Sequence, residues 1–393
     1  MSGSAQSFLR RAVIHTARRT ISALEQPQAS SSEPGLPSAG EQEVASTSPV
    51  DAPADTASVL EQEPTEPAPV AEPPPGAPAR FARGLPPGNF ADDRQSVSRM
   101  LYERLSDADL AAVDRAIDEH PDLWMLAETA TIDERVPLIL SYGAWLNHPA
   151  IIAKTGLSAA QPPEEVHAMA RGALAAAGGL YEADLIVNAL TSAGVEMKDV
   201  SRALDFGCSS GRVLRVLQAA FPETSWQGCD PNAAAVVWAS ENLPKIDFFV
   251  NDDTPPLPLE DGSLNLAYAI SIWSHFAPEF GLRWFEEMYR VIGPGGHLVM
   301  TTHGLASVGF YATNSLRMPQ QSDEILGALY RDGWWYAPEF GEEGDWGVVN
   351  PDWGTAFLSP EWVLTQLCPR WRVLEFAPGR NQNNQDVYVL QRV

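Results

Sequence analysis

Hydrophobic positions follow a helical rhythm over roughly residues 90–195. In "SDADLAAVDRAIDEH", Leu110, Val113 and Ile117 recur at intervals of three and four, and Ser106 stands where a helix N-cap belongs. The stretches "VPLILSYGAWL", "EEVHAMARGALAAAGG" and "GGLYEADLIVNALTSAGV" are also predicted to be helical, the last one ending at Gly194. The pattern predicts a helical cap region over 90–195 that precedes a different kind of unit.

From residue 196 to 393 short apolar runs alternate with helical segments. The runs predict strands at 202–206, 225–230, 245–251, 264–273 and 297–302, separated by helices at 212–221, 233–243 and 279–292. Strands that alternate with helices indicate an α/β fold with a mostly parallel sheet covered on both faces. Two further runs, 371–377 and 386–392, are separated only by a polar loop, so they are predicted to be antiparallel neighbours.

The N-terminal part of the chain has a different character. Residues 1–24 combine four arginines with interleaved apolar residues, which predicts a basic amphipathic arm for an anionic membrane or a protein partner. The same composition resembles an organelle transit peptide, and a frayed helix without a role is the simpler alternative. Residues 25–89 are rich in proline and glutamate and are expected to be a disordered linker.

Composition narrows the class of partner. The 393 residues include 51 acidic and 26 basic side chains, a formal net charge of -25, which disfavours a nucleic-acid partner. Three widely spaced cysteines form neither a disulfide framework nor a metal-binding pattern, so no metal is expected. No apolar run reaches the roughly 20 residues of a membrane span. We expect a cytoplasmic protein, with peripheral membrane contact through the arm left open; the oligomeric state is not predicted.

The stretch "ALDFGCSSGRVL" (203–214) has two interpretations. Gly207-Cys208-Ser209-Ser210-Gly211 fits G-x-S-x-G, the turn that exposes a hydrolase serine. It also fits a turn from a strand into a helix that holds a nucleotide-like cofactor, with Asp230 at the end of the next strand as the acid for ribose hydroxyls. The hydrolase interpretation is disfavoured because the turn follows the first strand of its sheet. A nicotinamide dehydrogenase is a separate candidate, but the glycine spacing is not the G-x-G-x-x-G of that class.

Later segments extend this motif. "LDFGCSSGRVLRVL", "WQGCDPN", "FVNDDTPPLPLEDGSLNLAYAISIWSHF" and "WFEEMYRVIGPGGHLVMTTHG" occur in an order and at a spacing that resemble the class I S-adenosylmethionine (SAM) methyltransferases over most of residues 200–304. The resemblance implies a Rossmann-like, seven-stranded, mostly parallel sheet with an antiparallel last strand, and SAM as cofactor. Ser209 departs from the family, which usually has glycine there.

The resemblance also implies roles for individual residues. Asp205 would hold the ammonium group of the cofactor, Asp230 the ribose hydroxyls, and Asp253, with Asp252 as a near alternative, the adenine amino group. Tyr181 could reach the carboxylate, although simple helix packing explains it equally. The complete set of expected cofactor-binding residues is Asp205, Gly207, Cys208, Ser209, Gly211, Asp230, Pro231, Asp252, Asp253, Thr254, Ile270, Ser271 and Tyr181.

Methyl transfer to oxygen requires a group that removes a proton from the acceptor. His303 and His275 follow predicted strands and would lie at the ligand-binding edge of the sheet, with His303 the first choice and His167 in the cap a third candidate. A structural role, with ring nitrogens bonded to the backbone, is the alternative for each.

A long insert, residues 304–359, is expected to form a substrate lid. It interleaves aromatic and acidic side chains, which could stack on sugar rings or hold a cationic amine. The expected substrate contacts are Trp334, Trp335, Tyr336 and Trp346; the alternative is a small satellite core that holds the insert down. The sequence therefore predicts a methyltransferase acting on a small-molecule or glycan acceptor, at oxygen. An N- or C-methyltransferase of a metabolite, lipid or quinone and a non-catalytic SAM-binding scaffold remain alternatives.

Overall fold

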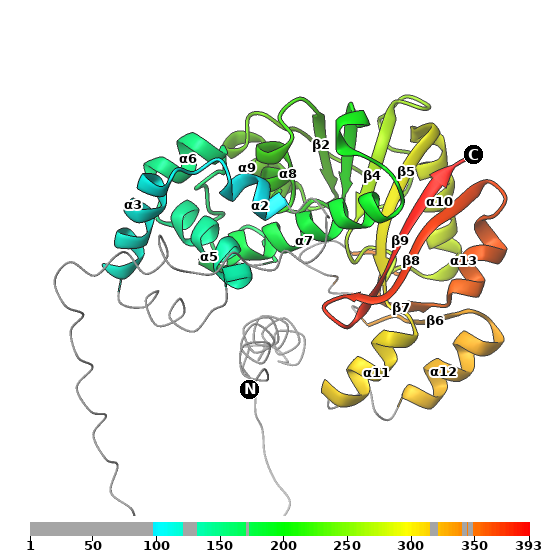
Figure 1. The fold of residues 1–393 in the computed structure, drawn as a ribbon. Coiled ribbons are helices and arrows are strands. Elements are labelled where there is room, and N and C mark those ends of the chain that lie inside the picture. The colour runs from blue at the N-terminus through cyan, green and yellow to red at the C-terminus, as the bar shows by residue number, and fades with distance from the viewer. Residues whose placement is uncertain (1–96, 121–131, 170–172, 315–320, 340–343, 345–348) are drawn as a thin grey trace, which may run out of the picture. The chain divides into compact units, whose positions relative to one another are not determined.

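The structure, a computed structural model, describes residues 97–120, 132–169, 173–314, 321–339, 344 and 349–393. The predicted arm (1–24) and linker (25–89) lie outside the described residues, as does Trp346. Figure 1 shows the described part as a twisted sheet with helices on both sides.

The sheet has seven strands in the order β3-β2-β1-β4-β5-β9-β8. Strands β1 to β5 pair in parallel, and β9 runs antiparallel to both β5 and β8. The predicted fold class is therefore confirmed. The strands are β1 (Arg202–Phe206), β2 (Ser225–Asp230), β3 (Asp247–Val250), β4 (Leu264–Ala269), β5 (Ile292–Thr302), β8 (Trp371–Asn381) and β9 (Gln385–Arg392).

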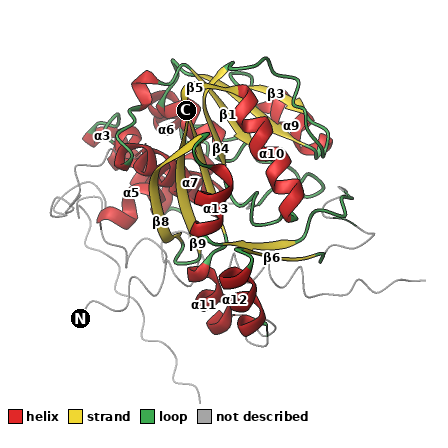
Figure 2. Ribbon diagram, turned by 90° about the vertical axis from the view of Figure 1, so that its right-hand side faces the viewer, coloured by secondary structure: helices red, strands yellow, loops and turns green. Residues whose placement is uncertain are grey.

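Successive side chains of the strands belong to two separate hydrophobic clusters. Ala203 and Tyr268 face one cluster, whereas their neighbours Leu204 and Ala267 face the other, as the two-residue period of a strand requires. The first cluster is covered by α7 (Ala173–Ser192), α8 (Leu214–Ala220) and α9 (Ala233–Asn242). The second is covered by α10 (Pro278–Val291) and α13 (Pro360–Leu367), which lie against the sheet in Figure 2.

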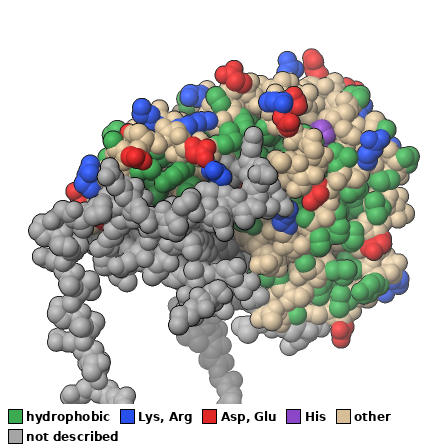
Figure 3. All heavy atoms as spheres, in the orientation of Figure 1, with side chains coloured by type: hydrophobic (Ala, Val, Ile, Leu, Met, Phe, Trp, Pro, Cys, Tyr) green, Lys and Arg blue, Asp and Glu red, His purple; other side chains and the backbone are tan. Residues whose placement is uncertain are grey.

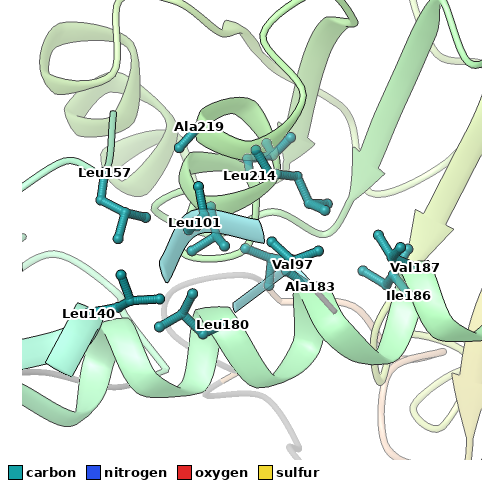
Figure 4. Packing of buried hydrophobic residues seen from close by; sticks show 14 of the residues in the cluster. Val97, Leu101, Leu140, Leu157, Leu180, Ala183, Ile186, Val187, Leu214 and Ala219 are labelled. Carbon is teal, nitrogen blue, oxygen red and sulfur yellow. The ribbon is translucent and has the colours of Figure 1, made fainter. Parts of the chain in front are cut away.

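The cap region adds α2 (Val97–Tyr102), α3 (Asp107–Asp118), α5 (Ile132–Trp145) and α6 (Pro149–Thr155). The predicted N-cap is confirmed, because the Ser106 side chain accepts from the Asp109 amide while Asp109 accepts from the Ser106 amide. Val97 and Leu101 pack with Leu214 and Ala219 of α8 in one cluster (Figure 4). Arg104 donates to the backbone oxygens of Ala219, at 2.8 Å, and Ala220, at 2.9 Å, at the C-terminal end of α8.

The cap differs from the prediction at one place. Residues 164–169 were expected to be helical, but they belong to an irregular segment, and the following helix, α7, begins only at Ala173. The His167 carbonyl, which would accept a backbone hydrogen bond in a helix, accepts one from the Ser209 hydroxyl of the loop after β1. A long-range contact has therefore overridden the local helical pattern.

The insert contains α11 (Leu305–Asn314), α12 (Ser322–Arg331) and a two-stranded sheet of β6 (Trp334–Ala337) and β7 (Thr355–Leu358). Figure 2 places α11 and α12 beyond the end of the sheet at which β9 begins. Val308, Ile325, Leu329, Trp335 and Phe357 form a third, smaller hydrophobic cluster. The satellite core that was kept as an alternative for this insert is present.

Asp386, at the start of β9, is almost completely buried. Its Oδ1 accepts from the Gly379 amide at 2.7 Å, and a side chain at Gly304 would collide with its Oδ2. Burial raises the pKa of Asp386 from 3.8 to about 6. Ionisation of this carboxyl group therefore lowers the stability of the fold: the loss begins as the pH rises above about 4 and is complete above about pH 6.

We predict that Asp386→Asn stabilises the protein at pH 8 and not at pH 4. The wild-type carboxyl group is charged in both states at pH 8, and its raised folded pKa then corresponds to a cost of at most about 3 kcal/mol. Urea unfolding at the two pH values measures the difference. The exposed Asp247→Asn serves as control, and an equal gain at both pH values would contradict the assignment.

Candidate functional site

The expected site residues cluster at the carboxyl ends of the central parallel strands. The chain order reverses between β1 and β4, since β2 and β3 lie on one side of β1 while β4 and β5 lie on the other. At such a switch point the loops after adjacent strands separate and leave room for a ligand. The segments that follow β1, β2, β3, β4 and β5 all start from this edge.

The loop after β1 turns sharply around two glycines. Gly207 and Gly211 have φ angles of +87° and +72°, a region that glycine adopts without strain. The space that a side chain would need at Gly207 is taken by Ile272, and at Gly211 by Leu243 and Phe248. The missing side chains of both glycines therefore make room for packing within the protein.

Ser209 adopts the left-handed backbone conformation at the centre of this loop. Its φ is +48°, which costs a non-glycine residue about 1–2 kcal/mol. The Ser209 amide donates to Asp230 Oδ2 at 2.8 Å, and its Oγ lies 2.9 Å from His167 Nδ1. These contacts hold the strained residue in place.

Asp205 lies within β1 and is almost completely buried. Burial raises its pKa well above the ordinary value; the neighbouring Tyr268 hydroxyl acts in the opposite direction, and Glu182 and Asp230 raise it further. Arg212 lowers it but also pairs with Glu182 at 2.6 Å. The site thus brings three carboxyl groups close together in a buried place, where a cationic ligand would favour the ionised form of Asp205.

Asp230 ends β2, the strand that pairs with β1. Its Oδ1 accepts from the Asn232 amide at 2.8 Å and its Oδ2 from the Ser209 amide, so two loops fix the direction of the carboxylate. Pro231 follows and is half-buried.

The loop after β3 carries the expected adenine-binding residues. Asp253 is half-buried, whereas Asp252 and Thr254 are exposed. Asn251 Nδ2 donates to the Asp252 carbonyl at 2.6 Å, which holds the start of the loop. Among the two acids, the partly shielded Asp253 is the better candidate for a specific contact.

Two residues of α10 that sequence reasoning missed hold the end of this loop. The Leu257 amide donates to Glu287 Oε1 at 2.7 Å, and Arg290 donates to the carbonyls of Leu259 at 2.7 Å and Leu257 at 3.0 Å. Arg290 also pairs with Glu287 at 2.6 Å. The available signal was a glutamate three positions before an arginine on a predicted helix, a spacing that places both side chains on one face.

Ile270 and Ser271 follow β4, which is shorter than predicted because Ser271 has a φ of +63°. The Ser271 amide donates to Thr301 Oγ1 at 2.8 Å, and its hydroxyl accepts from Gln385 Nε2 at 2.6 Å. Side chains of β5 and β9 therefore fix the turn after β4.

The hydroxyl group of Tyr181 contacts the turn between β8 and β9 and not the loop after β1. Its oxygen accepts from the Gln382 amide at 2.9 Å, in the turn between β8 and β9. The packing alternative fits this contact, and we do not carry Tyr181 into the proposed cofactor site.

His303 and His275 lie close together, with ring centroids 6.3 Å apart. Nδ1 of the buried His303 is 3.2 Å from the Ala356 carbonyl and Nε2 is 3.1 Å from the Tyr311 hydroxyl. Burial, together with the nearby His275, lowers the pKa of His303 to about 3. His303 is therefore neutral, with both ring nitrogens engaged, which removes it as first choice for a base.

His275 is the better placed of the two. Its Nδ1 lies 2.8 Å from the Gly354 carbonyl, and its ring stacks on Trp353 at 4.8 Å. Because a carbonyl oxygen only accepts, Nδ1 carries the proton and the lone pair of the neutral ring is on Nε2. The side chain is half-buried.

The expected substrate aromatics are placed differently from the prediction. Trp334 packs against Trp362, with ring centroids 4.4 Å apart, and Trp335 packs into the third cluster and donates to Glu324. Both are buried, which corrects their expected role as stacking surfaces. Tyr336 is half-buried and donates to the Pro351 carbonyl at 3.0 Å.

Comparison with known proteins agrees with the geometry. Residues 203–296 match the family model described as "Methyltransferase domain". The chain carries a class I SAM-dependent methyltransferase domain. SAM is the cofactor of this class, and the matched segment contains Asp205, the glycine loop, Asp230 and the loop after β3.

A curated relative is malonyl-[acyl-carrier protein] O-methyltransferase of Alcanivorax borkumensis. It is 29% identical over 113 residues, which cover 27% of this chain and 36% of the relative. Solved structures with a similar fold include the PH0226 protein of Pyrococcus horikoshii (TM-score 0.37, 16% identity, 55% of this chain and 92% of that one). Another is geranyl diphosphate C-methyltransferase of Streptomyces coelicolor (TM-score 0.36, 12% identity, 54% and 77%). We assign the fold from the strand order, not from these distant structural likenesses.

The residues at this edge fit the charge of SAM. The cofactor carries a sulfonium and an ammonium group, and the site offers the acids Asp205, Glu182 and Asp230 beside Arg212, which is itself paired with Glu182. A cation beside Asp205 would favour its ionised form and offset the effect of burial. The oriented Asp230 carboxylate suits the two adjacent hydroxyls of a ribose.

We predict that Arg290→Ala destabilises the protein by about 3–5 kcal/mol, because it leaves the buried Glu287 without its cation. Urea unfolding measures this loss. The double variant Arg290→Ala/Glu287→Gln should recover part of it, since glutamine still accepts from the Leu257 amide without a charge. If the double variant were no more stable than Arg290→Ala, the unpaired charge would not be the cause.

Proposed function

We propose that the protein is a SAM-dependent methyltransferase that transfers a methyl group to an oxygen of a small, hydroxyl-bearing acceptor. The observation that carries the proposal is the pairing of a buried acid in β1, Asp205, with an oriented acid at the end of β2, Asp230, on either side of the glycine loop. This arrangement lies inside the segment that matches the methyltransferase domain.

In this proposal each residue binds one part of the cofactor. Asp205 holds the ammonium group, Asp230 accepts from the ribose hydroxyls, and Asp253 accepts from the adenine amino group, with the Thr254 backbone amide beside the ring. Gly207, Cys208, Ser209, Gly211, Pro231, Ile270 and Ser271 form the surrounding wall. When bound, the cofactor supplies a methyl group on a sulfonium, which an aligned nucleophile displaces in line.

His275 is the proposed proton acceptor. Its Nδ1–H is held by the Gly354 carbonyl and its ring by Trp353, so the orientation of Nε2 is set before the acceptor binds. A base held in this way can remove the hydroxyl proton as the oxygen attacks. The relative from Alcanivorax borkumensis is named an O-methyltransferase, which supports oxygen as the atom methylated.

Charge and surface support a small acceptor over a nucleic acid. On the face shown in Figure 3, Lys and Arg side chains stand among Asp and Glu side chains and do not form a continuous basic area. The burial of Trp334 and Trp335 also weakens the case for a glycan, because neither ring is available for stacking on sugars. None of the described helices combines the length and apolar character of a membrane span.

We predict that Asp205→Asn and Asp230→Asn each raise the Kd for S-adenosylhomocysteine at least about tenfold, since each removes a charge-assisted contact of about 1.5–3 kcal/mol. Titration calorimetry measures the Kd. The exposed Asp247→Asn, on β3, should bind like the wild type. Undiminished binding by both site variants would rule out the proposed cofactor site.

We predict that His275→Asn lowers kcat about 100-fold or more with little change in donor affinity. Asparagine can still donate to the Gly354 carbonyl through Nδ2, but it has no base, and general-base contributions are typically 10²–10⁴-fold. A panel of hydroxylated acceptors with detection of S-adenosylhomocysteine gives the rates, and His297→Gln on β5 is the control. Full activity of His275→Asn would show that His275 is not the base.

A further inference from the structure

A small network of polar side chains lies at the edge of the sheet where β4, β5 and β8 end and β9 begins. These four strands are neighbours in the order β4-β5-β9-β8 (Figure 1). Thr301, near the end of β5, is completely buried, and Gln385, the first residue of β9, is almost completely buried. Buried polar groups need hydrogen bonds that replace their contacts with water. Their partners within the protein therefore decide how they are oriented.

Thr301 is the centre of this network, and its contacts fix the direction of the hydrogen bonds. The Ser271 amide donates to Thr301 Oγ1 at 2.8 Å, and Thr301 Oγ1 donates its only proton to Gln385 Oε1 at 2.8 Å. The carboxamide of Gln385 then presents Nε2 to Ser271 Oγ, which lies 2.6 Å away. Asn381 Nδ2, at the end of β8, donates to the same Gln385 Oε1 at 3.1 Å. Side chains of β5, β8 and the turn after β4 thus hold Gln385 in one orientation.

The network holds Ser271 in a backbone conformation that is unfavourable by itself. Ser271 has a φ of +63°, while its amide is bonded to Thr301 and its hydroxyl to Gln385. A non-glycine residue persists in this conformation only where its surroundings hold it. The Ser271 hydroxyl also lies 2.9 Å from the hydroxyl of the buried Ser274, which extends the network along the turn. Residues 301 and 385 therefore determine the path of a turn that is far from them in sequence.

This turn packs directly on the glycine loop. Ile272, which follows Ser271, occupies the space that a side chain at Gly207 would need. Gly207 begins the loop after β1 and has a φ of +87°. A displacement of Ser271 would move Ile272, because the two residues are adjacent, and would remove the support of the loop on this side. A change at Thr301 thus reaches the proposed donor site through Ser271 and Ile272.

We propose that Thr301 and Gln385 are positioning residues for the methyl donor, which hold the turn after β4 against the glycine loop. The inference rests on the proposed function, because it concerns the loop that binds the donor there. Both residues lie outside residues 203–296, the segment that matches the methyltransferase domain. A purely structural role would make Thr301 important for the stability of the fold and not for the affinity of the folded protein for the donor.

Titration calorimetry of the full-length protein with S-adenosylhomocysteine tests the proposal, since a loss of folded protein changes the stoichiometry and not the Kd of the remaining sites. Thr301→Val keeps the shape of the side chain but removes the acceptor of the Ser271 amide, so it should raise the Kd about five- to tenfold. Thr301→Ser keeps the hydroxyl and should bind like the wild type. An unchanged Kd of Thr301→Val would overturn the proposal, and an equal loss in Thr301→Ser would assign the effect to packing and overturn it as well.

Thr224→Val is the matched control. The hydroxyl of the buried Thr224 donates to the Val200 carbonyl at 2.9 Å, just before β2 begins and therefore at the opposite edge of the sheet. This variant also loses a buried hydrogen bond of a threonine, so it should lower the melting temperature and leave the Kd at the wild-type value. A Kd raised equally in both valine variants would show that general destabilisation weakens binding, which would overturn the specific role of Thr301.

A double-mutant cycle tests whether Thr301 and Gln385 act together. Gln385→Met removes the carboxamide, keeps a side chain of similar length and should weaken binding about five- to tenfold. The double variant Thr301→Val/Gln385→Met should be no weaker than the weaker single variant, because both changes release the same turn. Multiplicative losses would show that the two residues act separately and would overturn their joint role. A wild type that does not bind S-adenosylhomocysteine would instead contradict the proposed function, and the inference with it.

Discussion

The site depends on a carboxyl group held in a place where water cannot stabilise its charge. Asp205 is nearly completely buried, and the acids Glu182 and Asp230 raise its pKa further. Such a group is costly to keep in a protein unless something compensates its charge. Arg212 does so only in part, since it is paired with Glu182. The strand order brings Asp205 and Asp230 together, because β1 and β2 are neighbours and both end at the same edge, and α7 adds Glu182.

Much of the fold could be predicted from the chain because its patterns are local. The alternation of strands and helices, the antiparallel final pair and the N-cap at Ser106 each follow from residues close together in sequence. The place of Asp230 at the end of β2 was predicted in the same way, whereas Asp205 was singled out only through the family resemblance. What failed were predictions that depend on partners far away in the chain. The helix expected at 164–169 is absent because His167 is bonded to Ser209, and Trp334 is buried by Trp362.

The glycines of the loop show why a correct motif can have an incomplete explanation. Their spacing pointed to the right place, but Ile272, Leu243 and Phe248 occupy the space that side chains at Gly207 and Gly211 would need. A one-dimensional pattern cannot separate a glycine that admits a ligand from one that admits a neighbouring side chain. The same limit applies to Glu287 and Arg290, whose importance lies in the loop carbonyls and amide that they bind some thirty positions earlier in the chain.

The loop after β1 combines these effects at Ser209. Its unfavourable φ would be relieved by glycine, so the folded structure keeps the serine at a cost that its contacts must offset. Those contacts lead in two directions, from the amide to Asp230 of the sheet and from the hydroxyl to His167 in the irregular segment between α6 and α7. Ser209 therefore connects this segment of the cap to the carboxylate at the end of β2. The strain at this position is best understood as the consequence of coupling the cap region to the donor-binding edge of the sheet.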